Sequence, residues 1–240
     1  MIESVNQVRI FPVASPQQEI LQHEVVITDA PELFFFLDYW GSRCADFSLP
    51  EPHKKLSIDS RLIVRTTYAD EPPFVNTYLS DLHTIIEKDF QLLDLSKPEE
   101  IKSTAAIDEI LASIKTENKT VMHLVQDCSS FIFHQFNYDK GITTIETTID
   151  EILEHRSGVC QDFAHVLLQL LRTIGIPSRY VSGYICPNKN GMRGEGATHA
   201  WVEAFIPAYG WEGIDPTKMY GLPITTLSWQ WAATLMIVRL

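Results

Sequence analysis

The stretch 156–165 reads RSGVCQDFAH and carries a cysteine from a turn into a helix. The segment that follows, Gln161–Ile174, has apolar residues at three- and four-residue intervals, which predicts an amphipathic helix that Gly175 is well placed to end. Cys160 therefore lies at a helix start, where unpaired backbone N–H groups and the positive end of the helix dipole favour a thiolate. Because the thiolate is the form that attacks carbonyl carbon, Cys160 is a candidate nucleophile. A small buried thiol is the alternative interpretation.

A histidine and an aspartate follow Cys160 on two predicted strands. His199 opens the strand His199–Ile206 after a glycine-rich segment, and Asp215 follows the strand Trp211–Ile214. A short turn joins these strands, so their far ends should be neighbours, and Asp215 can then accept a hydrogen bond from His199 and fix its orientation. Taken alone, each is more often an ordinary histidine or a turn aspartate. In this order after a helix-start cysteine, they make a papain-like arrangement of nucleophile, base and orienting residue.

The chain divides into a strand-rich first part and a helix-rich second part. The double proline within the segment 67–75 marks the boundary, which predicts a β-rich domain over residues 1–68 and a catalytic core over residues 74–240. Further strands are predicted at Gln7–Phe11, Glu19–Thr28, Leu33–Asp38, Cys44–Leu49, Lys55–Thr66 and Arg179–Ile185, and further helices at Asn76–Phe90, Pro98–Ile114, Lys119–Phe136 and Thr148–His155.

Three linked segments resemble the core of the bacterial transglutaminase-like superfamily. They are 156–165, quoted above, GIPSRYVSGY at 175–184 and THAWVEAFIPAYGWEGIDPT at 198–217. The first part of the chain, with Asp38-x-Trp-Gly41 and Pro52-His53, resembles the β-rich N-terminal region that precedes this core in the same family.

The resemblance implies an α+β fold, in which an N-terminal antiparallel β-sandwich-like domain is followed by a papain-like (transglutaminase-like) cysteine-protease core. It implies a catalytic triad of Cys160, His199 and Asp215, with no metal or organic cofactor. Members of this superfamily include cysteine proteases, transglutaminases and amidases. We therefore expect a cysteine-dependent acyl-transfer enzyme that hydrolyses a peptide or related amide bond through a thioester. Transglutaminase or amide-exchange activity, and a non-catalytic binding protein with a vestigial site, stay open as alternatives.

Other polar residues near the candidate triad have supporting roles in this interpretation. The oxyanion of a tetrahedral intermediate needs hydrogen-bond donors, and the candidates are the backbone N–H of Cys160 and, less directly, the hydroxyl of Tyr138. Asp162 is expected to complement the helix N-terminus or to pair with a base such as Arg179. His165, five positions after Cys160, lies well round the helix and is expected to pack.

Net charge, apolar runs and cysteine spacing indicate which partners, metal sites and cellular location to expect. The chain has 240 residues and a net charge of −12, which argues against nucleic acid and anionic membranes as partners. The first residues do not resemble a signal peptide, and no apolar run is long enough to span a bilayer. The four cysteines form no C-x-x-C pair, so we expect free thiols, no zinc site and a cytoplasmic location. The expected partner is a peptide or protein substrate.

The end of the chain departs from the family pattern. After Asp215-Pro216-Thr217 we expect a segment like VAVGRDYxDCxP, whereas residues 228–240 read SWQWAATLMIVRL. Another reading frame could encode the expected segment, so we hypothesise that the tail from about Leu227 arises from a frameshift. The coding DNA tests this hypothesis, and an ordinary divergent C-terminal strand is the alternative.

Overall fold

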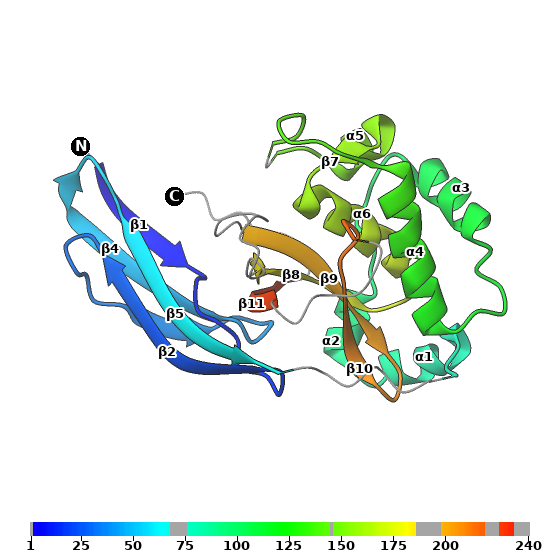
Figure 1. The fold of residues 1–240 in the computed structure, drawn as a ribbon, viewed down its shortest axis with the longest axis horizontal. Helices are drawn as coiled ribbons and strands as arrows, with labels where there is room; N and C mark the ends of the chain where they lie inside the picture. The colour runs from blue at the N-terminus through cyan, green and yellow to red at the C-terminus, as the bar shows by residue number, and fades with distance from the viewer. Residues whose placement is uncertain (1, 68–75, 145, 186–197, 219–225, 233–240) are drawn as a thin grey trace.

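The computed structural model describes residues 2–67, 76–144, 146–185, 198–218 and 226–232. The predicted glycine-rich loop at 187–197 lies outside these residues, as does the end of the chain after 232. Figure 1 shows the N-terminal strands at one end of the molecule, a second sheet in the middle and the helices at the other end. The middle sheet, which lies between the N-terminal strands and the helices, carries part of the candidate site.

The N-terminal domain is all β. Its strands are β1 (Ile2–Val8), β2 (Gln18–Ile27), β3 (Phe34–Leu37), β4 (Arg43–His53) and β5 (Ile58–Thr66). They form two antiparallel sheets, β1-β4-β3 and β2-β5. A small core lies between them, made of Val8, Phe11, Ile27, Ala45, Phe47 and Leu49. The sandwich-like domain expected from the sequence is thus present.

Strand β4 is longer than the sequence pattern predicts. The predicted strand ends at Leu49, whereas β4 continues through Pro50 and Pro52 to His53, which lies opposite Ile2 of β1. Strand β3 pairs only with residues 43–46, so this end of β4 has a single partner. Prolines are tolerated there because one edge of the strand needs no backbone donors.

The core domain combines six helices and a four-stranded sheet within the described residues. The helices are α1 (Leu79–Ile86), α2 (Phe90–Leu95), α3 (Thr104–Ile114), α4 (Val121–Gln135), α5 (Ile149–His155) and α6 (Cys160–Thr173). The sheet has the antiparallel order β10-β9-β8-β11, with β8 (Ser178–Ile185), β9 (Thr198–Ile206), β10 (Gly210–Ile214) and β11 (Thr226–Ala232). Two short strands, β6 (Asn137–Tyr138) and β7 (Ser157–Gly158), form a separate parallel pair.

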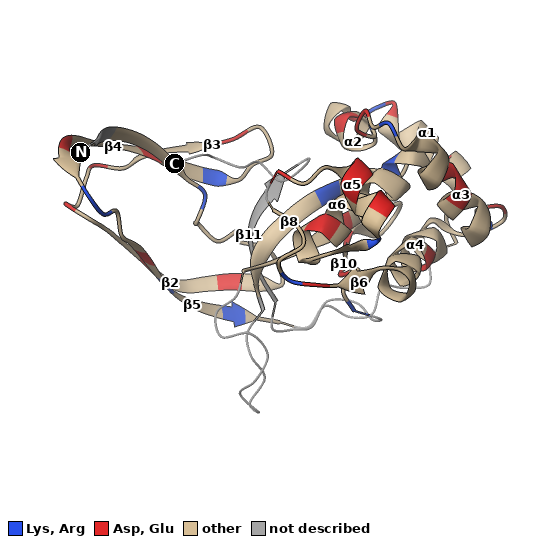
Figure 2. Ribbon diagram, turned by 90° about the horizontal axis from the view of Figure 1, so that it is seen from above, with Lys and Arg blue, Asp and Glu red and all other residues tan. Residues whose placement is uncertain are grey.

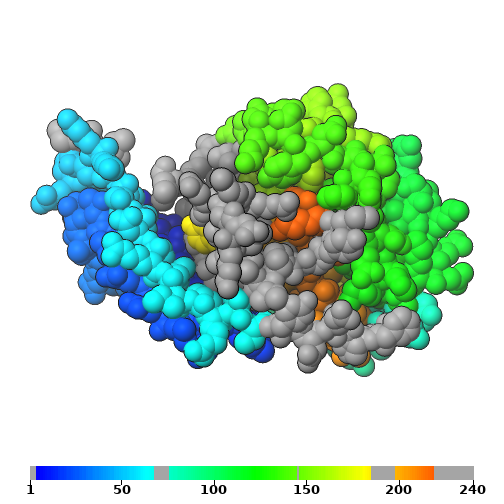
Figure 3. Space-filling view, viewed as in Figure 1, coloured from blue at the N-terminus to red at the C-terminus, as the bar shows by residue number. Residues whose placement is uncertain are grey.

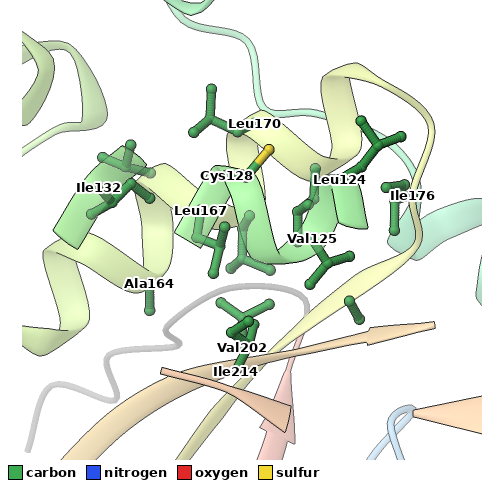
Figure 4. Close-up of a cluster of buried hydrophobic side chains, with 14 of the residues drawn as sticks. Leu124, Val125, Cys128, Ile132, Ala164, Leu167, Leu170, Ile176, Val202 and Ile214 are labelled. Atoms are coloured by element: carbon green, nitrogen blue, oxygen red, sulfur yellow. The ribbon is translucent and has the colours of Figure 1, made fainter. Parts of the chain in front are cut away.

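Helix α6 is the centre of the core. One face packs on α4 and the other on β9, so nearly all of its middle residues are buried. Figure 4 shows the resulting cluster, in which side chains of both helices meet those of the sheet: Leu124, Val125, Cys128, Ile132, Ala164, Leu167, Leu170, Ile176, Val202 and Ile214. Burial on both sides fixes the position of the helix, and with it the position of its first residue, Cys160.

The predicted helix Asn76–Phe90 is wrong in its extent, because the chain makes two helices there. Helix α1 ends at Ile86 and α2 begins at Phe90. The carboxylate of Asp89 accepts hydrogen bonds from the backbone N–H groups of Gln91 and Leu92, which starts a new helix. The apolar spacing continues across the break, so periodicity alone could not show it.

Contacts between the two domains involve the loop after β3 and helix α2. The hydroxyl of Tyr39 donates to Asp94 at 3.0 Å, and the amide of Gln91 lies 3.4 Å from the carbonyl oxygen of Tyr39. In Figure 3 the N-terminal residues (blue to cyan) and the helical residues (green) occupy opposite ends of the visible face.

The tail beyond residue 225 contributes one described strand. Thr226–Ala232 pairs antiparallel with β8 and lies at the edge of the central sheet. A strand in this place agrees with the strand interpretation of the tail, while its origin by frameshift stays a hypothesis.

Acidic positions are spread over α3, α4 and α5 (Figure 2), in keeping with the net charge of −12. Among the described helices none has the length and apolar character that crossing a membrane requires.

Candidate active site

The turn before α6 is held by the carboxylate of Asp162. This side chain is buried, and its Oδ2 accepts hydrogen bonds from the backbone N–H of Val159 at 2.7 Å and from the hydroxyl of Thr143 at 2.6 Å. It therefore satisfies one of the free donors at the helix start. The expected alternative, a pair with Arg179, does not form, because Arg179 pairs with Glu203. Asp162 thus holds the turn that ends at Cys160, the first residue of the helix.

A short parallel bridge brings Tyr138 to the same place. Strand β6 pairs with β7 so that Tyr138 lies opposite Gly158, and the Asp139 N–H donates to the Gly158 carbonyl at 3.0 Å. Burial, the neighbouring thiolate charge of Cys160 and a hydrogen bond with its side chain raise the pKa of Tyr138, although a hydrogen bond with the Cys160 backbone opposes the rise. The two oxyanion donors expected from the sequence, the Cys160 backbone N–H and the Tyr138 hydroxyl, therefore lie close to each other.

His199 lies on β9 and Asp215 directly follows the neighbouring strand β10, so the two residues are close, as their spacing predicts. His199 is the second residue of β9, and Asp215 directly follows β10, whose last residue, Ile214, pairs with Val202. The Nε2 of His199 lies 2.8 Å from the Oδ2 of Asp215, which is fully buried. The other oxygen, Oδ1, accepts from the backbone N–H and the hydroxyl of Thr217 at 3.0 and 2.7 Å.

The charges of this pair are mutually stabilised. Burial opposes protonation of His199, but hydrogen bonds with Asp215 and Cys160, together with their negative charges, raise its pKa to about 9. Burial likewise opposes ionisation of Asp215, but the hydrogen bond and charge of His199, with help from Thr217 and Lys218, lower its pKa to about 2. At neutral pH the pair is therefore an imidazolium and a carboxylate.

The structure brings Cys160, His199 and Asp215 together in one site. The Nε2 of His199 faces Asp215, and hydrogen bonding and charge from the Cys160 side chain also raise the pKa of this imidazole. The arrangement supports a histidine that is oriented by a carboxylate and exchanges a proton with a thiol. The catalytic roles of the three residues stay a prediction.

His165, which the sequence singled out, and two tryptophans of the central sheet make ring contacts. His165 is half-buried and stacks on Tyr180 with ring centroids 5.4 Å apart, so it packs against a neighbouring ring as expected. Trp201 stacks beside His199, and Trp211 lies under the guanidinium of Arg179 at 4.1 Å.

Three of the four cysteines fall within the described residues, and all three are free thiols. Cys44 and Cys128 are buried away from the site, and burial raises the pKa of Cys128 to about 12. Cys186 lies outside the described residues. Within the described part of the chain, no three His, Cys, Asp or Glu side chains gather in a way that could hold a metal ion.

Sequence reasoning missed two residues of the site. Thr143 fixes Asp162, and Lys218 places its ammonium 3.0 Å from the Oδ2 of Asp215. Lys218 had a local signal, since a basic residue three positions after a buried aspartate can fold back on it across a turn. Thr143 had no local signal, because it is 19 residues from its partner.

The comparisons with known proteins agree with this architecture. The sequence matches the transglutaminase-like superfamily over residues 108–216 and the bacterial transglutaminase-like N-terminal region over residues 1–65. An uncharacterized protein of Mycobacterium tuberculosis (strain ATCC 25618 / H37Rv) is 34% identical over 227 residues, covering 87% of this chain and 71% of that protein. A protein-glutamine gamma-glutamyltransferase of Pseudomonas aeruginosa is 38% identical over 98 residues, covering 36% of this chain and 15% of that protein.

A solved structure has the same fold. The crystal structure of a putative cysteine protease from Cytophaga hutchinsonii is similar with a TM-score of 0.78 at 21% identity, covering 98% of this chain and 78% of that chain. The likeness confirms the expected α+β fold, with a β-rich N-terminal part before a papain-like core.

Proposed function

The chain belongs to the transglutaminase-like superfamily, and from this membership and the geometry of the site we propose that it is a cysteine-dependent acyl-transfer enzyme. The proposed reaction is hydrolysis of a peptide or related amide bond through a thioester on Cys160. The observation that carries the proposal is the 2.8 Å contact between His199 and Asp215, together with the Cys160 side chain, which is near enough to raise the pKa of the same imidazole. No part of this reaction needs a metal or an organic cofactor.

Each step uses a group already in place. The Cys160 thiolate attacks the carbonyl carbon, forming a carbon–sulfur bond, and the carbonyl oxygen becomes an oxyanion. The N–H of Cys160 and the hydroxyl of Tyr138 are proposed to donate to that oxyanion. The His199 imidazolium gives its proton to the leaving amine as the carbon–nitrogen bond breaks, which leaves a thioester and a neutral imidazole.

Water completes the cycle. Neutral His199 takes a proton from a water molecule, the resulting hydroxide attacks the thioester, and the carbon–sulfur bond breaks to give a carboxylic acid and the Cys160 thiolate. His199 is then again an imidazolium paired with Asp215. Asp215 keeps the ring oriented throughout and does not itself change protonation, in agreement with its low pKa.

The substrate and location are part of the proposal. We propose a peptide or protein substrate, with neither nucleic acid nor membrane as partner, because the surface charge is strongly negative. A cytoplasmic location is proposed from the free thiols.

Alkylation by iodoacetamide between pH 4 and pH 9, with mass spectrometry to locate the modified cysteine, tests the proposed site. We expect Cys160 to react well below pH 8, and this reactivity to be lost or displaced in His199→Ala. Cys44 and Cys128 are internal controls, because both are buried and should stay unmodified in the folded chain. Labelling of Cys160 no faster than a free thiol, and indifferent to His199→Ala, would overturn the proposal in favour of a vestigial site.

Transfer of the acyl group to an amine is the second candidate function. The Pseudomonas aeruginosa protein-glutamine gamma-glutamyltransferase, 38% identical over 98 residues, favours it. Water and a primary amine compete for the same thioester, and exclusion of water decides which one reacts. Incubation with a glutamine-containing peptide and a fluorescent primary amine distinguishes them, since only transfer incorporates the amine.

A further inference from the structure

The ammonium of Lys218 is buried, which is unusual for a lysine. Long cationic side chains normally keep the ammonium in water and cover apolar surface with their stems. In Lys218 the arrangement is reversed, because the side chain as a whole is 31% exposed while the Nζ atom is buried. Burying an ammonium is costly unless a counter-charge accompanies it.

The counter-charge is the carboxylate of Asp215. A turn in which the Lys218 N–H donates to the Asp215 carbonyl at 3.0 Å brings the lysine back over the aspartate. The ammonium then lies 3.0 Å from Oδ2, the same oxygen that His199 approaches to 2.8 Å. The contact is an ion pair without hydrogen-bond geometry, and Nζ has no hydrogen-bond partner among the described residues. One carboxylate oxygen thus lies between two cations.

The ammonium makes the buried group of charges neutral. With Cys160 as thiolate and His199 as imidazolium, the site holds two negative charges, counting Asp215, and Lys218 supplies the second positive one. If the proton returns to the thiol, Asp215 and Lys218 still balance. Among the described residues, the charge of Cys160 also acts on two tyrosines, Tyr138 on β6 and Tyr180 on β8, and raises the pKa of both. Without Lys218, the group of Cys160, His199 and Asp215 would carry a net charge of −1 wherever the proton lies, because the Cys160–His199 pair is neutral in both of its forms.

We propose that Lys218 is a positioning residue of the triad, whose ammonium holds the Asp215 carboxylate in place and limits how strongly that carboxylate retains the proton of His199. The inference deepens the proposed function and rests on the assignment of the triad. A histidine that held its proton too strongly could not act as the base in the second half of the reaction. Lys218 acts only through Asp215, since its buried ammonium is not available to a substrate.

The test is the titration of His199 in a chain that lacks the nucleophile. In Cys160→Ala, the NMR signal of the His199 ring is followed against pH, with His199→Gln to identify it among the eight histidines. Adding Lys218→Met should move the His199 pKa upward by about one unit, because a nearby positive charge is lost. Lys218→Arg keeps the charge and should leave the titration close to that of the parent. An unchanged or lowered pKa in Lys218→Met would overturn the proposal.

A second measurement needs no substitution at residue 218, so it decides the matter if Lys218→Met does not fold. The rate of lysine acetylation is measured by mass spectrometry in the native chain. Lys218 should react at least about ten times more slowly than Lys97, whose side chain is 64% exposed, and should become faster in Asp215→Asn. Equal rates for Lys218 and Lys97 would mean that the ammonium is not held by Asp215, which also overturns the proposal.

These results are separate from those of the proposed function. Neither the histidine titration nor the acetylation rates require Cys160 or turnover. Failure of iodoacetamide labelling would therefore remove the proposed activity and leave the ion pair intact. Failure of the two Lys218 tests would remove the positioning role and leave the nucleophile intact.

Discussion

The carboxylate of Asp162 occupies the space into which a side chain on Gly158 would project. A Cβ atom at position 158 would lie 2.7 Å from the Oδ2 of Asp162 and 2.8 Å from its Cβ. Oδ2 is also the atom that accepts from the Val159 N–H and the Thr143 hydroxyl. The glycine is therefore required by a close approach rather than by its backbone angles, and the approach supports the first turn of α6.

Gly158→Ala is expected to displace Asp162 and loosen the turn that carries Cys160. We expect a loss of about 1–3 kcal/mol in the free energy of unfolding, typical of overpacking, and slower alkylation of Cys160. Urea unfolding and iodoacetamide labelling measure the two effects. The matched control is the double variant Gly158→Ala/Asp162→Gly, in which both the Oδ2 and the Cβ of residue 162 are gone.

The double variant makes this prediction specific. If the clash is the cause, Gly158→Ala should cost much less in an Asp162→Gly background than in the native chain, since the two residues are in contact. Additive losses would show instead that the alanine acts elsewhere, for example on the β6–β7 bridge that Gly158 forms with Tyr138.

Tyr138→Phe removes the hydroxyl that contacts Cys160. If this hydroxyl donates to the oxyanion, the rate of acylation should fall about 10–100-fold, because a preorganised donor in a protected site contributes strongly to the transition state. Burst kinetics with a p-nitrophenyl ester measure acylation directly. Tyr39→Phe is the control, since it loses a hydroxyl bonded to Asp94 at the domain contact and should acylate normally. A Tyr138→Phe chain that acylates at the native rate would leave the Cys160 N–H as the candidate donor.

The proximity of the three candidate residues could be predicted because it follows from local structure. A helix start fixes Cys160, and two antiparallel strands joined by a short turn fix the proximity of His199 and Asp215. Each of these elements has a clear period and clear end signals. The order of the three residues along the chain then leaves few other ways to bring them together.

Three other features, namely the position of Tyr138, the break between α1 and α2 and the burial of the Lys218 ammonium, could not be predicted because they depend on contacts between separate parts of the chain or on a single capping residue. Tyr138 reaches Cys160 only through the two-residue bridge between β6 and β7, which has no periodicity of its own. The break between α1 and α2 depends on a capping side chain, Asp89, within a continuous apolar pattern. The burial of the Lys218 ammonium depends on a turn after the last predicted strand and on the surrounding core.

Leu167→Ala tests the packing that positions α6. Leu167 is fully buried in the cluster formed by α4, α6 and the sheet, so truncation should leave a cavity and cost about 2–5 kcal/mol. Leu37→Ala is the matched control, because Leu37 is 69% exposed and the same change there should cost about 0.5 kcal/mol or less. Urea unfolding followed by tryptophan fluorescence compares them, and similar losses for both variants would contradict the placement of α6.

The pair of His199 and Asp215 should make stability depend on pH in a defined window. The pKa of His199 is raised from 6.5 to about 9, so its contribution is fully present below pH 6.5 and is lost as pH rises through 9. The pKa of Asp215 is lowered from 3.8 to about 2, so its contribution is present above pH 3.8 and is lost as pH falls through 2. Between about pH 4 and pH 6.5 both contributions are complete.

His199→Gln removes the titrating group and isolates its contribution. The free energy of unfolding is measured in urea from pH 4.5 to pH 9.5 for the native chain and the variant. The difference between them should be constant up to pH 6.5 and then shrink by on the order of 3 kcal/mol towards pH 9.5, because the native imidazolium loses its proton there. His134→Gln, on the exposed end of α4, controls for the general effect of removing a histidine. A difference that stays constant to pH 9.5 would mean that His199 is not held as an imidazolium by Asp215 and Cys160.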